Sequence, residues 1–188
     1  MSINPWKPLS RRLRTDAGRR KIEDVEFEMP DGSRDTFSLF YMGKAVAILA
    51  LTTDKKVILA RQFRPGPCQI LDELPGGGMD DGESPDVAAA RELIEETGYS
   101  PGTLQYLGSP HECGYSNVER HAYLATNCIK TGSQKLDHGE DIEVVLKPVI
   151  EFIQQLVAGQ CTDCEVAWMG LYRANLIVEK SLAPCASE

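Results

Sequence analysis

The segment that most constrains the fold is a run of glycines followed by a helix with clear start and stop signals. The glycine run 76–78 precedes Ser84 and Pro85, and a stretch without glycine or proline then extends to Gly98. Serine is a favoured N-cap, proline suits the first helical turn, and glycine suits the C-terminal exit. The sequence therefore predicts a glycine loop that leads directly into a helix over residues 85–97.

This helix carries one apolar and one acidic face. The predicted apolar face consists of Val87, Ala90, Ile94 and Thr97, which we expect to pack on a sheet. On the opposite face, Glu92, Glu95 and Glu96 have the spacing i, i+3 and i+4 that brings them into one patch. Magnesium, a hard cation that takes oxygen ligands, is a natural counter-charge for such a cluster. Solvated acidic helix faces are common, so the three glutamates alone leave a surface role open.

Strand patterns flank the helix on both sides. Alternating apolar residues around a turn at 30–33 predict a hairpin formed by residues 25–29 and 37–41. Further strands are predicted at residues 45–52, 56–63, 104–107, 121–128 and 142–146, and further helices at 149–158 and 163–172. Because strands and helices alternate without a regular β-α-β rhythm, we expect a mixed α/β (α+β) fold with a partly antiparallel sheet.

Composition narrows the class of function. The chain of 188 residues has a formal net charge of −8, which argues against general nucleic-acid binding, where a basic face supplies affinity. The longest uninterrupted apolar stretch, residues 45–51, is too short to span a membrane, and no apolar signal region follows the basic N-terminal segment. We therefore expect a cytoplasmic protein with no nucleic-acid or membrane partner. An anionic substrate would have to be held by metal ions and a few placed arginines.

The six cysteines fit a reducing compartment. Their spacing is not that of a small disulfide scaffold, so we expect free thiols. Cys161 and Cys164 have the Cys-x-x-Cys spacing of half a zinc site or of a redox pair. Because no second pair or neighbouring histidine accompanies them, we favour two thiols near the start of a C-terminal helix.

A long motif of fixed spacing covers the glycine loop and the helix. It reads Gly77, five residues, Glu83, seven residues, Arg91-Glu92-Leu93, one residue, Glu95-Glu96, one residue, Gly98-Tyr99. This pattern resembles the Nudix box at every position, and the loop–helix context was predicted independently. Residues 61–65 (RQFRP), 73–77 (ELPGG) and 139–144 (GEDIEV) resemble the ADP-ribose pyrophosphatase and nucleoside-diphosphate-sugar branch of the Nudix hydrolase superfamily. The resemblance covers about residues 20–175, and it implies a Nudix-type mixed sheet sandwiched between helices.

The resemblance also implies roles for the site residues. The metal ligands would be Glu92, Glu95, Glu96 and the main-chain carbonyl of Gly76. They would hold two or more Mg²⁺ ions, with Mn²⁺ as a substitute, which polarise phosphoryl oxygens and acidify the water that attacks phosphorus. Arg91 would orient the glutamates, and Glu83 would support the loop–helix geometry. Arg64 would contact the diphosphate or the second sugar, and Arg61 and Glu119 are further predicted substrate-binding residues.

Two departures from this branch leave alternatives open. Cys113 stands where a Ser-Pro-Gly turn usually has its proline, so GDP-mannose or another nucleoside diphosphate derivative remains an alternative to ADP-ribose. Relatives often carry two acidic residues two apart in a late loop, and here these positions hold His138 and Glu140. Together with Glu95 and Arg91 these two are our catalytic candidates, and Glu140 is the favoured water-activating group. A non-catalytic sensor of ADP-ribose-like ligands is the alternative of another class, and the intact glutamate set counts against it.

The resemblance finally implies a homodimer. In this branch the N-terminal strands are typically exchanged between subunits, so we expect residues 1–42 to form an exchanged N-terminal β region and residues 43–188 to form the Nudix hydrolase domain. An isolated hairpin is only marginally stable, which is a physical reason for such a region to be covered by a partner.

Overall fold

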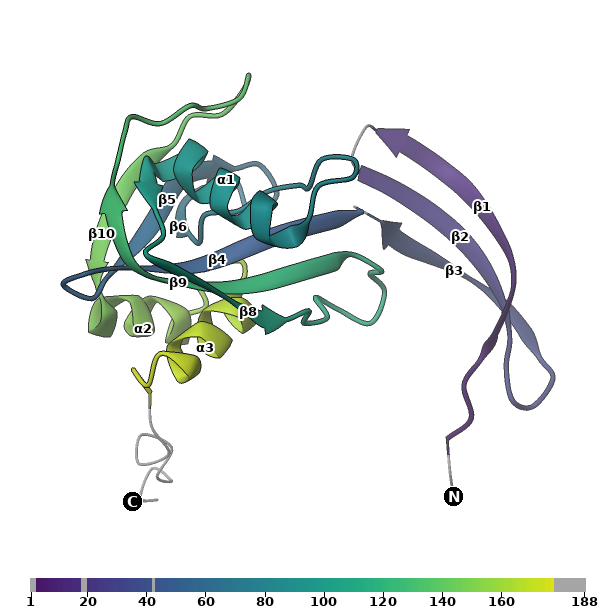
Figure 1. Ribbon diagram of the computed structural model, residues 1–188. Coiled ribbons are helices and arrows are strands. Elements are labelled where there is room, and N and C mark those ends of the chain that lie inside the picture. Colours follow the sequence, from purple (N-terminus) through teal and green to yellow (C-terminus); the bar gives the residue numbers. More distant parts are fainter. Residues whose placement is uncertain (1–2, 18–19, 42, 178–188) are drawn as a thin grey trace, which may run out of the picture. The chain divides into compact units, whose positions relative to one another are not determined.

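The computed structural model describes residues 3–17, 20–41 and 43–177. Their strands are β1 (Lys7–Ala17), β2 (Arg20–Glu28), β3 (Arg34–Tyr41), β4 (Lys44–Thr52), β5 (Lys56–Arg64), β6 (Gln69–Glu73), β7 (Tyr99–Ser100), β8 (Thr103–Gly108), β9 (Glu119–Lys130) and β10 (Glu143–Pro148) (Figure 1). Their helices are α1 (Pro85–Thr97), α2 (Val149–Val157) and α3 (Cys164–Arg173). The chain divides into two compact units, one made of Met1–Lys44 with His111–Arg120 and the other of Ala45–Pro110 with His121–Glu188.

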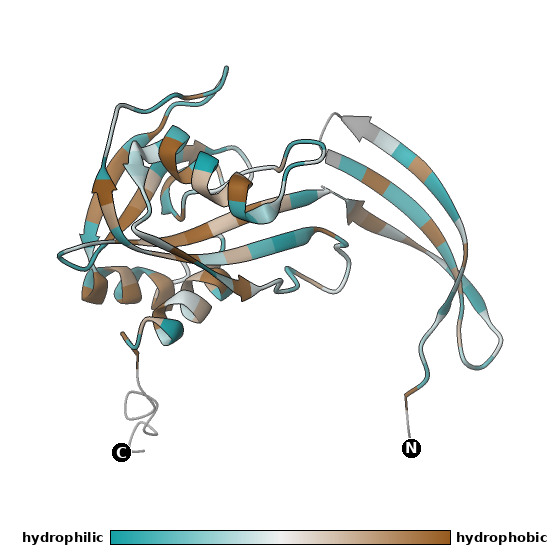
Figure 2. Cartoon of the chain, in the orientation of Figure 1, coloured by the Kyte–Doolittle hydropathy of each residue, from teal (hydrophilic) through white to brown (hydrophobic). Residues whose placement is uncertain are grey.

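The first unit contains a three-stranded antiparallel sheet in the order β1-β2-β3. Strands β2 and β3 form the predicted hairpin, closed by a turn in which the N–H of Gly32 donates to the carbonyl of Met29 at 2.9 Å. Figure 2 shows hydrophobic and hydrophilic positions alternating along β2. Strand β1 was not predicted, because five of its eleven residues are charged and no regular apolar alternation runs through it. Ion pairs to β2, such as Arg11–Glu23 at 3.2 Å, support it in place of an apolar face.

The second unit is built on a sheet of order β10-β5-β4-β9-β7, with β6 paired to β5 and β8 paired to β9. Strand β4 is buried on both faces, so its residues alternate between two apolar clusters. The first cluster includes Val46, Ile48 and Ala50 of β4 with Ala88, Ala89 and Leu93 of α1. The second includes Ala47, Leu49 and Leu51 of β4 with Phe152 of α2 and Leu171 of α3. The sheet is therefore covered by α1 on one face and by α2 and α3 on the other, which confirms the predicted mixed α/β fold (Figure 1).

Helix α1 has the predicted bounds and a different buried face. Gly98 ends the helix in the left-handed region, at φ +72°, and its N–H donates to the carbonyl of Ile94 at 2.8 Å. The predicted apolar face is wrong except at Thr97, which is buried, because Val87 is 57% exposed and Ala90 and Ile94 are only partly buried. The residues buried on α1 are Ala88, Ala89, Glu92, Leu93, Glu96 and Thr97. Two adjacent alanines let the helix approach the sheet closely, and this orientation turns two glutamates inward.

Two other features of the described residues are relevant to function. None of their helices combines the length and the apolar character that crossing a membrane requires. Cys161 and Cys164 are free, and the thiol of Cys164 donates to the carbonyl of Cys161 at 3.0 Å. Burial raises the pKa of Cys161 to about 12, which disfavours the thiolate that metal binding or thiol exchange needs. Cys185 lies outside the described residues.

Candidate active site

Arg91 is the centre of an ion-pair network that joins the glycine loop to helix α1. Its Nε and Nη2 each donate to one oxygen of Glu83 at 2.9 Å, and Nη2 also donates to the carbonyl of Gly78 at 3.2 Å. Its Nη1 donates to Glu92 at 2.9 Å and to Glu95 at 3.0 Å. These hydrogen bonds lower the pKa of Glu83 to about 2 and raise that of Arg91. One guanidinium thus sets both the loop geometry and the orientation of two of the three glutamates.

Glu92 and Glu96 are acidic residues in a largely buried position. They are 8% and 4% exposed, respectively. Burial raises the pKa of Glu92 and raises that of Glu96 to about 8, and the negative charges of Glu92 and Glu140 act on Glu96 in the same direction. The N–H of Gly76 donates to Oε2 of Glu96 at 2.9 Å. Two carboxylates held together in this environment lack a full counter-charge, which a divalent cation would supply.

The glycine loop lies against strand β4 and close to the glutamates. The N–H groups of Val46 and Ile48 donate to the carbonyls of Gly77 and Pro75, at 2.9 and 3.0 Å. The carbonyl between them, that of Gly76, accepts no hydrogen bond from the described residues. A Cβ at Gly77 would lie only 2.6 Å from Oε1 of Glu92. The glycines therefore allow the backbone to come within ligand distance of the carboxylates.

Arg64 and Arg61 lie on opposite faces of strand β5, because a spacing of three reverses the side-chain direction on a strand. Arg64 forms an ion pair through Nε with the fully buried Glu73 of β6. Glu73 lies three residues before Gly76, whose N–H donates to Glu96 at 2.9 Å. The positive charge of Arg64 partly opposes the rise in the pKa of Glu96. A substrate anion near Glu96 can therefore be reached by the Arg64 side chain.

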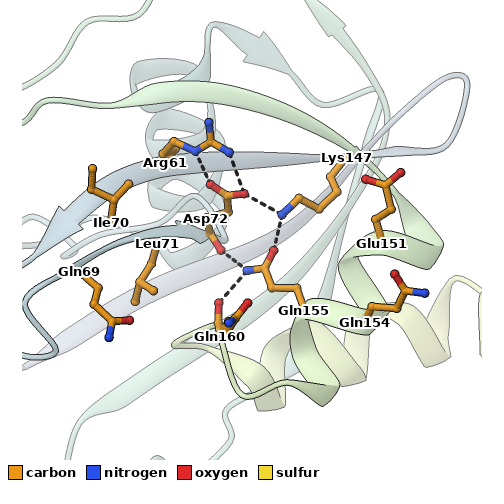
Figure 3. A pocket seen from close by; sticks show the side chains of 10 residues that line it. All are labelled: Arg61, Gln69, Ile70, Leu71, Asp72, Lys147, Glu151, Gln154, Gln155 and Gln160. Carbon is orange, nitrogen blue, oxygen red and sulfur yellow. Dashed lines mark hydrogen bonds and ion pairs between the residues drawn. The ribbon is translucent and has the colours of Figure 1, made fainter.

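Arg61 instead lines a cavity of about 580 Å³ between β5, β6, β10 and α2 (Figure 3). It binds both oxygens of Asp72, at 2.6 and 3.2 Å, and Lys147 reaches the same carboxylate at 2.7 Å. Gln155 completes this network by donating to the main-chain carbonyl of Asp72 at 2.6 Å. Since the charges of this cavity are neutralised by one another, the predicted substrate role of Arg61 gains no support from its position.

The other predicted residues fall in two places. Glu140 acts electrostatically on both Glu92 and Glu96, and it accepts the N–H of Asp137 at 2.9 Å within its own loop. His138 belongs to the same loop and is exposed. Glu119 belongs to the first unit, where it forms an ion pair with Lys44 at 3.3 Å. Glu140 therefore lies within electrostatic range of the glutamate cluster, in a loop whose Gln134 donates to the carbonyl of Glu96 at 2.7 Å. The contacts of Glu119 lend no support to its predicted substrate role.

The donor set fits a hard divalent cation. Within the described ranges no three His, Cys, Asp or Glu side chains converge on a common point, because Arg91 draws Glu92 and Glu95 to itself and Gly76 holds Glu96. The donors in this region are nevertheless oxygens only, namely buried carboxylates and an open backbone carbonyl. This is the ligand chemistry that Mg²⁺ and Mn²⁺ prefer.

Comparison with known proteins agrees with this geometry. Residues 42–159 match the family model of the NUDIX domain. The chain belongs to the Nudix family. It is 30% identical over 149 residues to the ADP-ribose pyrophosphatase of Bacillus subtilis, covering 78% of this chain and 80% of that protein. It is 29% identical over 138 residues to the methanol dehydrogenase activator of Bacillus methanolicus, covering 72% and 75%. The crystal structure of an ADP compounds hydrolase has the same fold, with a TM-score of 0.75 and 21% identity over 94% of this chain and 100% of that one.

Two residues of this Nudix hydrolase beside Arg64 were given no role by sequence reasoning. Glu73 was noted only as part of the ELPGG pattern, and Thr162 was not singled out. The hydroxyl of Thr162 donates to Oε1 of Glu73 at 2.6 Å. The sequence signal that could have drawn attention to Glu73 is a glutamate three residues before the glycine run, in the segment that resembles the family. The contact with Thr162, 89 residues away in the chain, depends on the tertiary fold.

Proposed function

We propose that this Nudix hydrolase is a magnesium-dependent pyrophosphatase that cleaves the diphosphate of nucleoside diphosphate sugars, with ADP-ribose as the preferred substrate and AMP and ribose 5-phosphate as products. The observation that carries the proposal is the buried pair of carboxylates, Glu92 and Glu96, held against the glycine loop by the N–H of Gly76. Arg64 is the nearby cation, because it forms an ion pair with Glu73, three residues before Gly76. A cation next to oxygen ligands for a divalent metal is the arrangement that a diphosphate requires. The name of the Bacillus subtilis relative supports ADP-ribose in particular.

The metal would be held by Glu92, Glu95, Glu96 and the Gly76 carbonyl. When bound, it would neutralise these carboxylates and withdraw electron density from the phosphoryl oxygens. Arg91 keeps two of the glutamates oriented through its hydrogen bonds.

The remaining steps belong to side chains that reach the substrate. Arg64 binds oxygens of the diphosphate through its terminal nitrogens and so fixes the phosphorus that is attacked. Glu140, whose charge acts on Glu92 and Glu96, accepts a proton from the attacking water. The water oxygen forms a bond to one phosphorus, and the bond between that phosphorus and the bridging oxygen breaks. The bridging oxygen leaves on the second phosphate, and the proton taken by Glu140 passes to this phosphate or to solvent, so that two phosphate monoesters are released.

A product assay over a substrate panel tests this proposal. The full-length protein is incubated with Mg²⁺ and, separately, with ADP-ribose, GDP-mannose, UDP-glucose or a diadenosine polyphosphate, and products are separated by ion-exchange chromatography. We expect ADP-ribose to give the highest kcat/KM and equal amounts of AMP and ribose 5-phosphate, with no turnover in excess EDTA. The Glu96→Gln variant, purified in parallel, controls for contaminating hydrolases. A higher kcat/KM for GDP-mannose would show that the proposed substrate is wrong. Tight binding of ADP-ribose without turnover would show that the protein is a sensor of this ligand and not an enzyme.

A further inference from the structure

The side chain of Arg64 is held by one residue, Glu73. In the part of the chain that the structure describes, the hydrogen bond from Nε to Oε2 of Glu73 is the one polar contact of this guanidinium. Both residues belong to the β5–β6 hairpin, where Ala60 pairs with Glu73 and Arg64 with Gln69. The Arg64 side chain is 38% exposed, whereas that of Glu73 is fully buried. In this ion pair, Glu73 is therefore the buried partner and Arg64 is the partner that reaches solvent.

The second oxygen of Glu73 is held from another part of the fold. Thr162 lies in the loop that precedes α3, and its hydroxyl donates to Oε1 of Glu73 at 2.6 Å. A buried carboxylate is stable only when its oxygens are compensated. Here one oxygen is taken by Arg64 and the other by Thr162. The Glu73 carboxylate cannot rotate without losing one of these two partners.

This arrangement leaves the outer edge of the Arg64 guanidinium available. Because the group is planar, holding Nε restricts the orientations that Nη1 and Nη2 can take. Arginine binds a phosphate best through two parallel N–H donors, which requires a defined plane. Glu73 lies three residues before Gly76, whose N–H donates to Glu96 at 2.9 Å, so the ion pair holds Arg64 on the segment that leads to the carboxylates of the Nudix box.

We propose that Glu73 and Thr162 are positioning residues for substrate binding, which hold Arg64 with its terminal nitrogens directed at the substrate diphosphate. This inference rests on the proposed function, since it takes Arg64 as the residue that contacts the diphosphate. It adds that the α2–α3 loop, which contributes no ligand to the metal, controls affinity for the substrate through one hydroxyl group.

The Thr162 hydroxyl is the group to test, because a change at Glu73 would leave an unpaired cation next to the core. Thr162→Val keeps the shape of the side chain and removes the donor, and Thr162→Ser keeps the donor as a matched control. Both are assayed with ADP-ribose at saturating Mg²⁺, and melting temperatures verify folding. We expect Thr162→Val to raise KM about three- to tenfold, the worth of one hydrogen bond, with kcat within about twofold of the wild type. Thr162→Ser should keep the wild-type KM. A role confined to stability would lower the melting temperature without moving KM.

Arg64→Lys, which keeps the charge and loses the planar fork, separates this inference from the function on which it rests. We expect it to raise KM more than Thr162→Val does, and we expect Thr162→Val to add nothing when combined with it. If Arg64→Lys raises KM and Thr162→Val does not, the positioning role is overturned and the proposed function stands. If Arg64→Lys leaves KM unchanged, the assignment of Arg64 to the diphosphate is overturned, and the positioning role with it.

Discussion

Arg91 and Glu83 form a two-point ion pair, with both donor–acceptor distances at 2.9 Å, that fastens the glycine loop to helix α1. Glu83 precedes the helix, and Arg91 lies on it two turns later. The same guanidinium donates to Glu92 and Glu95. The position of the loop and the orientation of the glutamates are therefore coupled through one cation. A substitution of Glu83 should alter the orientation of Glu92 and Glu95, although Glu83 makes no direct contact with them in the network described.

The first prediction concerns the stability of Glu83→Gln as a function of pH. The ion pair lowers the pKa of Glu83 from 4.5 to about 2, so the unfolded chain takes up a proton at a higher pH than the folded protein. The wild type should therefore exceed Glu83→Gln in free energy of unfolding by a constant amount above about pH 5.5. The difference should shrink as the pH falls through 4.5 toward 2. Urea titrations in EDTA at several pH values measure it, and a difference that stays constant down to pH 3 would contradict the ion-pair account.

The second prediction is that Glu92→Gln and Glu96→Gln each lower kcat by at least about a hundredfold, because each removes a negative charge from the proposed metal site. The glutamine keeps the side-chain volume and can still accept the N–H of Gly76 at position 96, so the fold should be preserved. Steady-state assays with ADP-ribose at saturating Mg²⁺, together with melting temperatures, test this. Glu151→Gln, an exposed carboxylate on α2, is the matched control and should keep full activity. Substantial turnover in either box variant would refute the metal-site assignment.

The third prediction uses the close approach at Gly77. A methyl group there would lie 2.6 Å from a Glu92 carboxylate oxygen, which is the movable end of a side chain. Gly77→Ala should therefore displace the carboxylate and lower kcat about tenfold or more, while the melting temperature changes little. Gly132→Ala is the control, since nothing lies within 4 Å of its added carbon. Equal activity in the two variants would show that the position of Glu92 does not limit turnover.

The sequence predicts those features of this site that depend on residues close together in the chain, and it does not predict those that depend on tertiary packing. The bounds of α1 could be predicted because Pro85 and Gly98 act within one helical turn. Its buried face could not, since packing of Ala88 and Ala89 on β4 decides the rotation of the helix and buries Glu92 and Glu96. Strand β1 was missed because it has no alternating apolar pattern, and its ion pairs with β2 become apparent only once the two strands are paired. The separation of Arg61 from Arg64 was not predicted either, since both were assigned to the substrate, although a spacing of three on a strand directs two side chains to opposite faces.

The fourth prediction is that the protein is a homodimer in which residues 1–42 pack on the partner. The three-stranded sheet carries an aromatic cluster of Trp6, Phe27, Phe37 and Tyr115, in which the Trp6 and Phe37 ring centroids lie 5.2 Å apart. Trp6 and Tyr115 remain 45% and 60% exposed in the single chain, and exposed aromatic clusters favour association. Light scattering after size exclusion at micromolar concentration should give twice the chain mass of 20.8 kDa. A monomer would refute the prediction.

The last prediction concerns the group that accepts the proton from the attacking water. Glu140 is favoured because its charge acts on Glu92 and Glu96, so it lies within electrostatic reach of the proposed metal ligands. A carboxylate needs only modest basicity beside a divalent cation, and it can also bind magnesium, which an imidazole does less readily. His138 is exposed, belongs to the same loop, and is the alternative base.

The two assignments differ in what each substitution does to kcat at fixed Mg²⁺ between pH 6 and 9.5. We expect Glu140→Gln to lower kcat about a hundredfold or more, within the usual range for a general base. His138→Asn should retain near-normal turnover and the wild-type dependence of kcat on pH, because we expect this exposed side chain to take no part in proton transfer. A large loss in His138→Asn with near-normal Glu140→Gln would reverse the assignment. If kcat falls only slightly in both variants, neither residue is the base, and the contribution of Glu140 is limited to its electrostatic effect on Glu96.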